Sequence, residues 1–510
     1  MDELLEGDIN SEDIEHEWRK IKDITHRAAE EKLKKRKKRR KRKGLPVWND
    51  DIKKLIEEKK RAYLKWLHTK QQIHKIEYNR MRAIVKRETR KINRERWDKY
   101  IDEIETDVHT RQTTAFKILK HLNQDVRDVA KLDVIDNKEW RTHYKKLWVL
   151  NENEFISGDE DEMLRMEVDR IEYDELQETL VEMKNKKATG TDELNLELFK
   201  YSSDGMKRKL LHLINLCWKN CRIPVEWNIS LVKSLFKKGD RSDCNNYRGI
   251  SLLNTMYKVY AKIINKRLRS LTEVILDEFQ SGFRKGRSCS DNIFIVKQLI
   301  EKRREFTKPT FIIFIDYEKA FDRVLRKKLW EIMNKKGIPT HLIQVVKSLY
   351  HKTKIKLEND DDLIETNNGL KQGCCLSPTL FNIYIDEALR EWKSIVNKKY
   401  DMNFDNVTTL LYADDQIIIS DTEDSLQWTT HQLNIVMNKY AMKISVKKTQ
   451  CMAFVGPEPL RVKISISNEP VEQVSTFRLL GCEISYRGEV DIDKKLNNFN
   501  RMDGTIFRKL

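Results

Sequence analysis

Proline and glycine are scarce in this chain of 510 residues, which contains 8 and 16 of them. Because these residues dominate turns and flexible linkers, their scarcity predicts a helix-rich protein with few long loops. Long apolar runs are also missing, since none approaches the roughly 18 residues that a membrane-spanning helix needs. The first residues are acidic and polar, unlike a signal peptide. We therefore expect a soluble intracellular protein with no membrane partner.

Cysteines are few and follow no metal-binding or disulfide pattern. Cys217 and Cys221 lie one helical turn apart, but no paired histidine or cysteine completes a zinc site. They are expected to be buried thiols of a protein in a reducing compartment. The eight cysteines stand at positions 217, 221, 244, 289, 374, 375, 451 and 482.

Basic residues exceed acidic ones, with 99 Lys and Arg against 81 Asp and Glu and a net charge of +18. The excess favours a polyanionic partner, although it serves solubility equally well. Lys34 to Lys43 are ten consecutive basic residues, which cannot be buried together. They suit a disordered solubilising tail, nuclear import or attraction to phosphate backbones. Residues 1–45 are expected to be disordered, and the protein to be nuclear or cytoplasmic, with the basic run favouring the nucleus.

A helical region is predicted over residues 46–160. Between Trp48 and Ile104, apolar residues recur largely at spacings of three and four, without proline or glycine. Basic residues fill the other faces, which suits either a solvated helix or one that lies along a nucleic acid duplex. Shorter helices are expected to follow, and the acidic stretch Glu152 to Glu162 is expected to be a loop.

Two aspartates stand at the tip of a predicted hairpin. Val407 to Ser420 reads VTTLLYADDQIIIS, where two strand-forming runs flank Asp414 and Asp415. Alone, such a pair is most often a polar turn. However, the apolar run FIIFI, which suits a second buried strand, ends directly before Asp316. Two buried strands would thus each present carboxylate at one end.

Carboxylates that are brought together repel one another, and they protonate unless cations neutralise them. Oxygen ligands without histidine or cysteine favour Mg2+ or Mn2+ over zinc. Two such ions about 3.5 to 4 Å apart activate an attacking hydroxyl and stabilise the leaving oxygen of a phosphoryl transfer. The three aspartates therefore predict polymerase or nuclease chemistry with Mg2+ or Mn2+ as the cofactor.

The two acidic segments resemble motifs of reverse transcriptases. Tyr412 to Asp415 matches the YADD box, and Asp316 to Asp322, which reads DYEKAFD, is similar to the first catalytic motif of retrotransposons without long terminal repeats (LINE-like elements). In that family three aspartates hold two metal ions. The resemblance implies that the catalytic, metal-binding residues are Asp316, Asp414 and Asp415.

The same motifs imply roles for three aromatic residues. Phe321 corresponds to the ribose gate of the family, where a ring clashes with a 2′-hydroxyl and selects deoxynucleotides. The resemblance also puts Tyr317 at the nucleotide and Tyr412 at the nucleic acid.

Asn246 to Leu252 reads NYRGISL and is similar to the family's NYRPISL, except that Gly249 replaces proline. The resemblance implies that Arg248 contacts the incoming triphosphate, with Lys237 or Lys238 as a second cation. Fixed positive charge at close range suits a developing pyrophosphate.

Gln280 to Arg287 reads QSGFRKGR and resembles the family's QxGFRxGR element. Its glycines and basic residues suit a flexible loop on a sugar-phosphate backbone. The resemblance implies that Arg284 and Arg287 bind nucleic acid.

Leu370 to Pro378 reads LKQGCCLSP and resembles the segment GxxQGxxLSP of the family. The resemblance implies that Gln372 positions the pairing base and that Gly373 lets the backbone approach template and nucleotide. Farther along, Ile444 to Thr449 resembles a lysine-bearing motif, which implies that Lys448 protonates the leaving pyrophosphate.

Together these segments imply an α+β right-hand polymerase. Fingers and palm are expected over residues 161–430, and the end of the palm with the start of a truncated thumb over residues 431–510. The implied reaction is RNA-directed DNA synthesis by metal-dependent addition of deoxynucleotides to a primer 3′-hydroxyl. The implied partners are an RNA template, a DNA primer and deoxynucleoside triphosphates.

Two alternatives stay open. No upstream segment resembles the endonuclease that such elements carry, so a degraded, inactive copy that only binds nucleic acid is one of them. A group II intron maturase, which shares the acid box, is the other. The segments around Arg248 and Arg284 resemble the retrotransposon class more closely.

Overall fold

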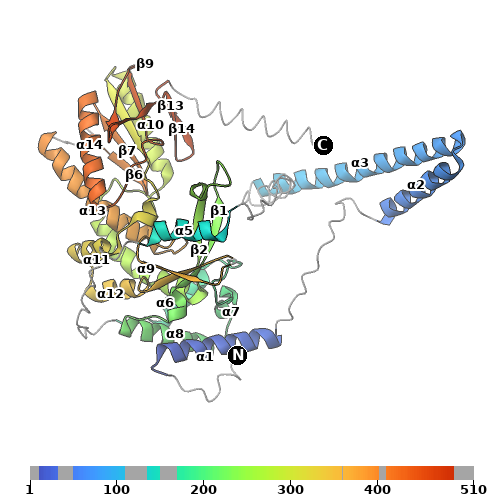
Figure 1. Ribbon diagram of the computed structural model, residues 1–510, viewed down its shortest axis with the longest axis horizontal. Coiled ribbons are helices and arrows are strands. Elements are labelled where there is room, and N and C mark those ends of the chain that lie inside the picture. Colours follow the sequence, from blue (N-terminus) through green and yellow to red (C-terminus); the bar gives the residue numbers. More distant parts are fainter. Residues whose placement is uncertain are drawn as a thin grey trace. The chain divides into compact units, whose positions relative to one another are not determined.

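A computed structural model describes residues 11–32, 50–108, 135–149, 169–358, 360–400 and 409–487 (Figure 1). The chain divides into two compact units, one of residues Lys34–Val134 and one of residues Met1–Leu33 and Ile135–Leu510. The basic run and the acidic stretch predicted to be a loop lie outside the described residues.

The smaller unit contains a hairpin of two helices, α2 (Asp50–Thr69) and α3 (Gln72–Val108). Its helices contact each other through the rings of Tyr63, Trp66 and Tyr78, whose centroids lie 5.2 to 5.9 Å apart. The uninterrupted apolar periodicity explains the length of these helices, because neither segment contains a residue that would break the backbone hydrogen bonds.

The larger unit is built on two main sheets. The first has the strand order β2-β1-β4-β5, and the second has the order β12-β8-β3-β7-β6 with β9 paired to β8. The strands are β1 (Ile229–Phe236), β2 (Tyr247–Leu252), β3 (Thr310–Ile315), β4 (Thr353–Leu357), β5 (Leu363–Thr366), β6 (Thr409–Tyr412), β7 (Asp415–Ser420), β8 (Gln450–Val455), β9 (Glu458–Pro459) and β12 (Glu472–Gln473). Two small pairs complete the set, β10 (Ser465–Ile466) with β11 (Glu469–Pro470) and β13 (Thr476–Leu479) with β14 (Cys482–Ser485).

Helices cover the sheets and connect their strands. They are α5 (Asn137–Trp148), α6 (Tyr173–Glu182), α7 (Leu196–Lys200), α8 (Asp204–Asn220), α9 (Thr255–Ile275), α10 (Cys289–Glu305), α11 (Arg326–Lys335), α12 (Thr340–Ser348), α13 (Ser377–Lys399) and α14 (Glu423–Lys439), with short 3-10 turns at Val225–Asn228, Cys244–Asn246 and Ala320–Arg323.

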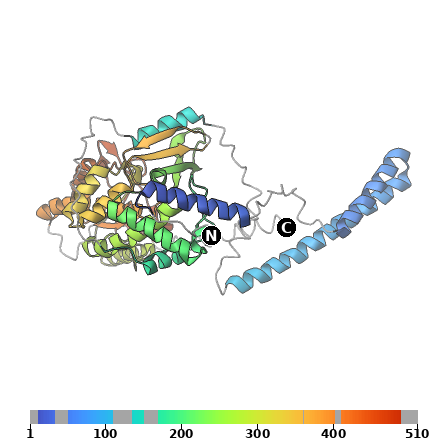
Figure 2. The same cartoon turned by 90° about the horizontal axis from the view of Figure 1, so that it is seen from below.

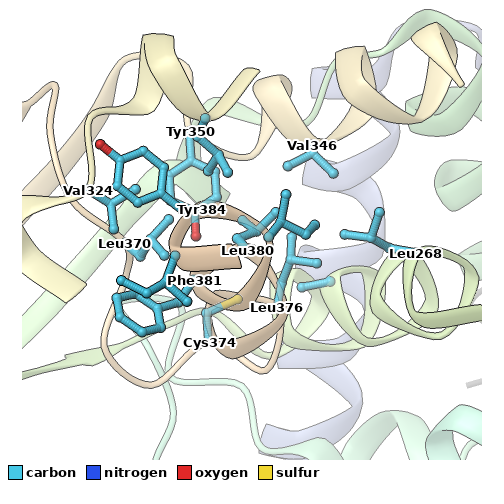
Figure 3. Packing of buried hydrophobic residues seen from close by; sticks show 14 of the residues in the cluster. Leu268, Val324, Val346, Tyr350, Leu370, Cys374, Leu376, Leu380, Phe381 and Tyr384 are labelled. Atoms are coloured by element: carbon cyan, nitrogen blue, oxygen red, sulfur yellow. The ribbon is translucent and has the colours of Figure 1, made fainter. Parts of the chain in front are cut away.

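Strand β3 is buried on both faces, which explains its uninterrupted apolar sequence. Ile313 and Ile315 join the main core with α13 and α14. Ile312 and Phe314 face a second core formed with α10 and the β13–β14 hairpin. Figure 3 shows part of the main core, where the side chains of α13 lie among residues from α9 and α12. These layers hold the end of β3 in a fixed position.

The N-terminal segment differs from the predicted disorder of residues 1–45, because Ile14–Lys32 form helix α1. Figures 1 and 2 both show α1 lying along α8. The indole of Trp18 donates to Glu226 Oε2 at 2.7 Å and meets the ring of Trp227 edge-on at 5.4 Å. Burial of one apolar stripe orders this helix, although most of its residues are charged.

Helix α5 belongs to the larger unit and lies against the first sheet. This differs from the prediction, which placed its residues in one helical region over residues 46–160. No helix among the described residues is long and apolar enough to cross a bilayer.

Candidate functional site

The three aspartates of the sequence analysis come together at one edge of the second sheet. Strand β3 pairs antiparallel with β7, so Ile315 lies opposite Gln416, and β6 pairs with β7 so that Tyr412 lies opposite Asp415. Asp316 therefore follows its strand at the level where Asp414 and Asp415 form the turn. The long-range pairing of β3 and β7 creates this acidic edge.

Crowding perturbs the acids of the turn. Desolvation raises the pKa of Asp415 to about 6, and the charges of Asp414 and Asp316 add to the rise. Desolvation and the charge of Asp316 also raise the pKa of Asp414, although Arg248 and Lys237 oppose this shift. A divalent cation would offset both the desolvation of these acids and their mutual repulsion.

The three aspartate side chains are not arranged as a preformed metal site. Among the residues that the structure describes, no three His, Cys, Asp or Glu side chains are close enough to hold a metal. Instead, Lys448 Nζ lies 3.3 Å from Asp316 Oδ2. The predicted proton donor thus neutralises one of the predicted metal ligands.

Positive charge comes from the β1–β2 hairpin. The backbone of Lys237 bonds to Asn246 O at 2.9 Å, and the charges of Lys237 and Arg248 both act on Asp414. Burial and the nearby cations Arg248 and Lys448 lower the pKa of Lys237. Both lysines offered by the sequence are exposed, and Lys237 is the one whose charge acts on Asp414.

Tyr317 departs from its predicted role. Its ring is 4% exposed, and its hydroxyl donates to the amide oxygen of Gln416. Burial raises the pKa of this phenol far above its ordinary value. The ring is part of the core, so a side-chain contact with a nucleotide is not available here. Tyr412, at the end of β6, is half-buried beside the acidic turn.

Phe321 lies on the 3-10 turn that follows β3. Its ring stacks on Phe381 of α13, with centroids 4.5 Å apart, and meets the exposed ring of Phe283 edge-on at 6.5 Å. Two aromatic neighbours restrict the ring of Phe321, as a steric gate requires.

Gln372 and Gly373 lie against strand β2. Gly373 has a φ of +120°, and a Cβ there would lie 2.7 Å from Ser251 O. Only glycine fits this close approach. The Ser251 N–H donates to Gln372 O at 2.8 Å, which fixes the backbone before the glycine.

Lys371 anchors the same loop from inside. It is 7% exposed, and its Nζ donates to Leu349 O at 2.9 Å and to Asn228 Oδ1 at 3.2 Å. Desolvation lowers the pKa of Lys371 from 10.5 to about 7. Between pH 7 and pH 10.5, Lys371 is protonated to a greater extent in the unfolded chain than in the folded protein. The free energy of unfolding therefore rises with pH in this range.

We therefore expect the free energy of unfolding to increase between about pH 7 and pH 9 in the wild type, and to increase less in Lys371→Met. Urea unfolding followed by circular dichroism at several pH values measures this difference. Lys297→Met, which changes an exposed lysine of α10, should keep the wild-type pH dependence. The same slope in all three proteins would contradict the assignment.

The loop of Gln280 to Arg287 differs from its predicted role in one residue. The Arg284 side chain is only 6% exposed and bonds to Glu273 Oε1 at 2.9 Å and to the carbonyls of Asp277 and Gln280. It holds the loop together instead of facing solvent. Arg287 is exposed and donates to Glu278 O at 3.3 Å, so it stays a candidate for nucleic acid contact.

Gln280 is a site residue that the sequence analysis missed. Its Oε1 accepts the Ala413 N–H at 3.0 Å, and its Nε2 donates to Ala413 O at 3.3 Å. Ala413 has a left-handed φ of +59°, which costs a non-glycine residue about 1 kcal/mol or more. Gly282 allows this contact, since a Cβ there would lie 2.2 Å from Ala413 N. Gln280 thus clamps the turn that carries the acid pair.

Removing this clamp should misplace the acids without removing them. In Gln280→Ala we expect the turnover of any reaction at the site to fall roughly 10- to 100-fold, the effect of a misplacement of about 1 Å. Initial rates of product formation measure the effect, with Gln298→Ala on α10 as the control. Wild-type rates in Gln280→Ala would show that the turn at Ala413 keeps its conformation without the hydrogen bonds from Gln280.

Comparisons with known proteins show which families the chain is similar to. Residues 236–484 match the family described as reverse transcriptase (RNA-dependent DNA polymerase). The Transposon TX1 uncharacterized 149 kDa protein of Xenopus laevis is 29% identical over 257 residues, which cover 49% of this chain and 19% of that protein. The Pol polyprotein of the type-1 retrotransposable element R2 of Nasonia vitripennis is 24% identical over 67% of this chain and 32% of its own length. An RNA-directed DNA polymerase from the mobile element jockey of Drosophila melanogaster is 21% identical over 64% of this chain and 35% of its own length.

The chain therefore spans about a fifth to a third of the length of these three relatives. Among solved structures, apo telomerase from Candida tropicalis, truncated from its C-terminal domain, aligns with a TM-score of 0.38 and 14% identity over 51% of this chain and 53% of that one.

Proposed function

Since residues 236–484 of this chain are a reverse transcriptase domain similar to those of retrotransposons without long terminal repeats, we propose that the protein is an RNA-directed DNA polymerase. The observation that carries the proposal is the gathering of Asp316, Asp414 and Asp415 at one sheet edge, with Lys237 and Arg248 beside them. A buried strand pair that presents three acids next to two cations suits the transfer of a nucleotide from a triphosphate.

The donor set suits Mg2+ or Mn2+, because it consists of carboxylate oxygens alone. Burial and the charges of neighbouring acids raise the pKa values of Asp414 and Asp415, and a bound cation would oppose this rise. Asp316, Asp414 and Asp415 would hold the ions. Bound divalent cations would activate the primer 3′-hydroxyl and stabilise the leaving oxygen. Because Lys448 pairs with Asp316, binding of a cation competes with this ion pair.

The other residues bind and orient the substrates. Arg248 and Lys237 neutralise the triphosphate, and Lys448, once released from Asp316, donates a proton to the pyrophosphate. Phe321 excludes a 2′-hydroxyl. Gln372 and Gly373 lie beside the nucleotide, and Arg287 and Tyr412 contact the nucleic acid.

The partners that we propose are an RNA template, a DNA primer and deoxynucleoside triphosphates. We also propose that fingers and palm extend over residues 161–430, with the end of the palm and the start of a thumb over residues 431–510. The run Lys34 to Lys43 favours a nuclear location by its charge.

Primer extension tests the proposal. The purified chain is given a poly(rA) template, an oligo(dT) primer, dTTP and Mg2+ or Mn2+, beside Asp316→Asn purified in parallel. We expect extension by the wild type, loss of extension with a chelator and none by the variant. Equal extension by both proteins would reveal a contaminating polymerase.

A wild type that binds the primer–template but never extends it would instead favour the inactive, nucleic-acid-binding alternative.

A further inference from the structure

Helix α5 lies outside the residues that match the reverse transcriptase family, yet it reaches the proposed nucleotide site. Its last residue, Trp148, is 7% exposed and lies beside the loop that leads to Gln372. The Trp148 carbonyl accepts the N–H groups of Asn367 at 3.0 Å and Asn368 at 3.2 Å. The end of α5 is therefore fixed to this loop.

An aromatic stack attaches the rest of α5 to the first sheet. Trp140, Tyr144 and Trp148 are spaced four residues apart, and their rings stack with centroids 5.8 and 4.7 Å apart. The Tyr144 hydroxyl lies 2.8 Å from Ser234 Oγ on β1. Three successive rings on one face make α5 a rigid support.

Gly249 makes room for this stack. A Cβ at this position would lie 2.8 Å from Tyr144 Cε1 and 3.1 Å from Trp148 Cη2. Here the NYRGISL segment has glycine where the motif that it resembles has proline, whose ring would occupy the same space. The departure from the motif and the presence of α5 are thus complementary features of this chain.

Trp148 and Gln372 share one buried carboxylate. The Trp148 Nε1 donates to Asp322 Oδ1 at 2.9 Å, and the Gln372 Nε2 lies 3.1 Å from both oxygens of Asp322. Asp322 is 6% exposed, and desolvation raises its pKa. The hydrogen bonds from Trp148 and Gln372 and the charges of Lys319 and Lys237 oppose this rise and favour the ionised form. A carboxylate that accepts the indole N–H on one oxygen cannot rotate freely.

This arrangement fixes the direction of the Gln372 amide. An ionised carboxylate accepts hydrogen bonds and cannot donate one, so the amide nitrogen must face Asp322 and the amide oxygen must face away. The amide oxygen is then available to a nucleotide in a single orientation.

We propose that Trp148 is a positioning residue for the nucleotide, because its indole N–H holds Asp322 in the orientation that directs the Gln372 amide. The inference rests on the proposed polymerase function and adds to it a determinant of nucleotide affinity outside the family domain. Its effect belongs to nucleotide binding and not to the chemical step, since no atom of Trp148 or Asp322 is assigned to the reacting groups.

Trp148→Phe tests the inference, because phenylalanine keeps an aromatic ring and removes the N–H. In single-nucleotide incorporation we expect the KM for dTTP to rise about tenfold, the loss of roughly one hydrogen bond to a charged group, with kcat changed less than about twofold. Trp392→Phe is the matched control, since its buried indole donates to Thr429 O at 3.0 Å in α14. It should leave both constants unchanged.

A double-variant cycle separates positioning from general support. In the Gln372→Ala background, Trp148→Phe should raise KM no further, because the amide that it directs is gone. An equal rise in both backgrounds, or a fall in kcat alone, would overturn the proposal. If Trp148→Phe folds poorly, Gly249→Ala replaces it in the test. This variant displaces the aromatic stack of α5 without changing Trp148 itself, and it should raise KM as Trp148→Phe does.

Equilibrium binding of dTTP with Ca2+ to the primer–template complex keeps the two proposals apart. A wild type that binds dTTP but does not extend refutes the polymerase, while the variants still report on Trp148. Extension by the wild type with unchanged affinity in Trp148→Phe and Gly249→Ala refutes the positioning role alone. Absence of dTTP binding by the wild type refutes both.

Discussion

Asp415→Asn is expected to abolish primer extension and at the same time to stabilise the metal-free fold. The activity should fall by roughly 10³-fold or more, because a ligand of the proposed metal site loses its charge. Stability should rise at neutral pH, where folding holds Asp415 ionised beside Asp414 and Asp316 although its pKa is raised to about 6. Extension assays and thermal unfolding of the same preparations measure the two effects.

Added Mg2+ should distinguish the wild type from this variant. A cation that binds only the folded state raises Tm, so Mg2+ should stabilise the wild type and have little effect on Asp415→Asn. Asp424→Asn, an exposed acid on α14, serves as the control and should behave as the wild type in both assays. Wild-type extension by Asp415→Asn would show that this carboxylate is not a ligand of the proposed metal site.

Phe321→Ala is expected to admit ribonucleotides. The stacked ring of Phe321 is held by Phe381 and Phe283, so a 2′-hydroxyl cannot push it aside. Without the ring, the ratio of kcat/KM for dTTP over UTP should fall by roughly 10- to 100-fold, the range available to a pocket that excludes one hydroxyl. Single-nucleotide incorporation with each substrate gives this ratio.

The control for this prediction is another half-buried aromatic residue, Trp428 of α14, which packs against Tyr400. Trp428→Ala should lower stability and leave the ratio unchanged. If Phe321→Ala behaves in the same way, its ring supports the core and does not select the sugar.

Sequence reasoning predicted the class of this protein well, because strand and motif signals are local. The helices and sheets of the structure confirm the α+β fold, and the match of residues 236–484 confirms the reverse transcriptase resemblance. The buried strand before Asp316 and the strands flanking Asp414 and Asp415 are where their apolar runs predict them. The individual roles assigned to the site residues stay predictions, and the proposed variants test those of Asp316, Asp415, Phe321 and Gln372.

Side-chain contacts between distant segments were less predictable. Arg284 looks like a nucleic acid contact in sequence but is enclosed by the carbonyls of its own loop, and Tyr317 points into the core. Both residues lie in motifs that specify the type of each residue but not the direction in which its side chain points. Trp18 likewise stands in a charged segment, and only the surface of α8 and Trp227 explains why its helix is ordered.

The sequence by itself determined which residues the proposed chemistry uses: three acids beside buried strands, the cations proposed for a triphosphate and the ring proposed to gate the sugar. These follow from short segments, because a strand and the residue after it are encoded together. Only the tertiary structure decided which side chains hold that chemistry in place. Gln280 reaches the Ala413 turn, and Trp148 reaches Asp322, across more than a hundred positions of chain. Such partners meet through packing, which leaves no local pattern in the sequence.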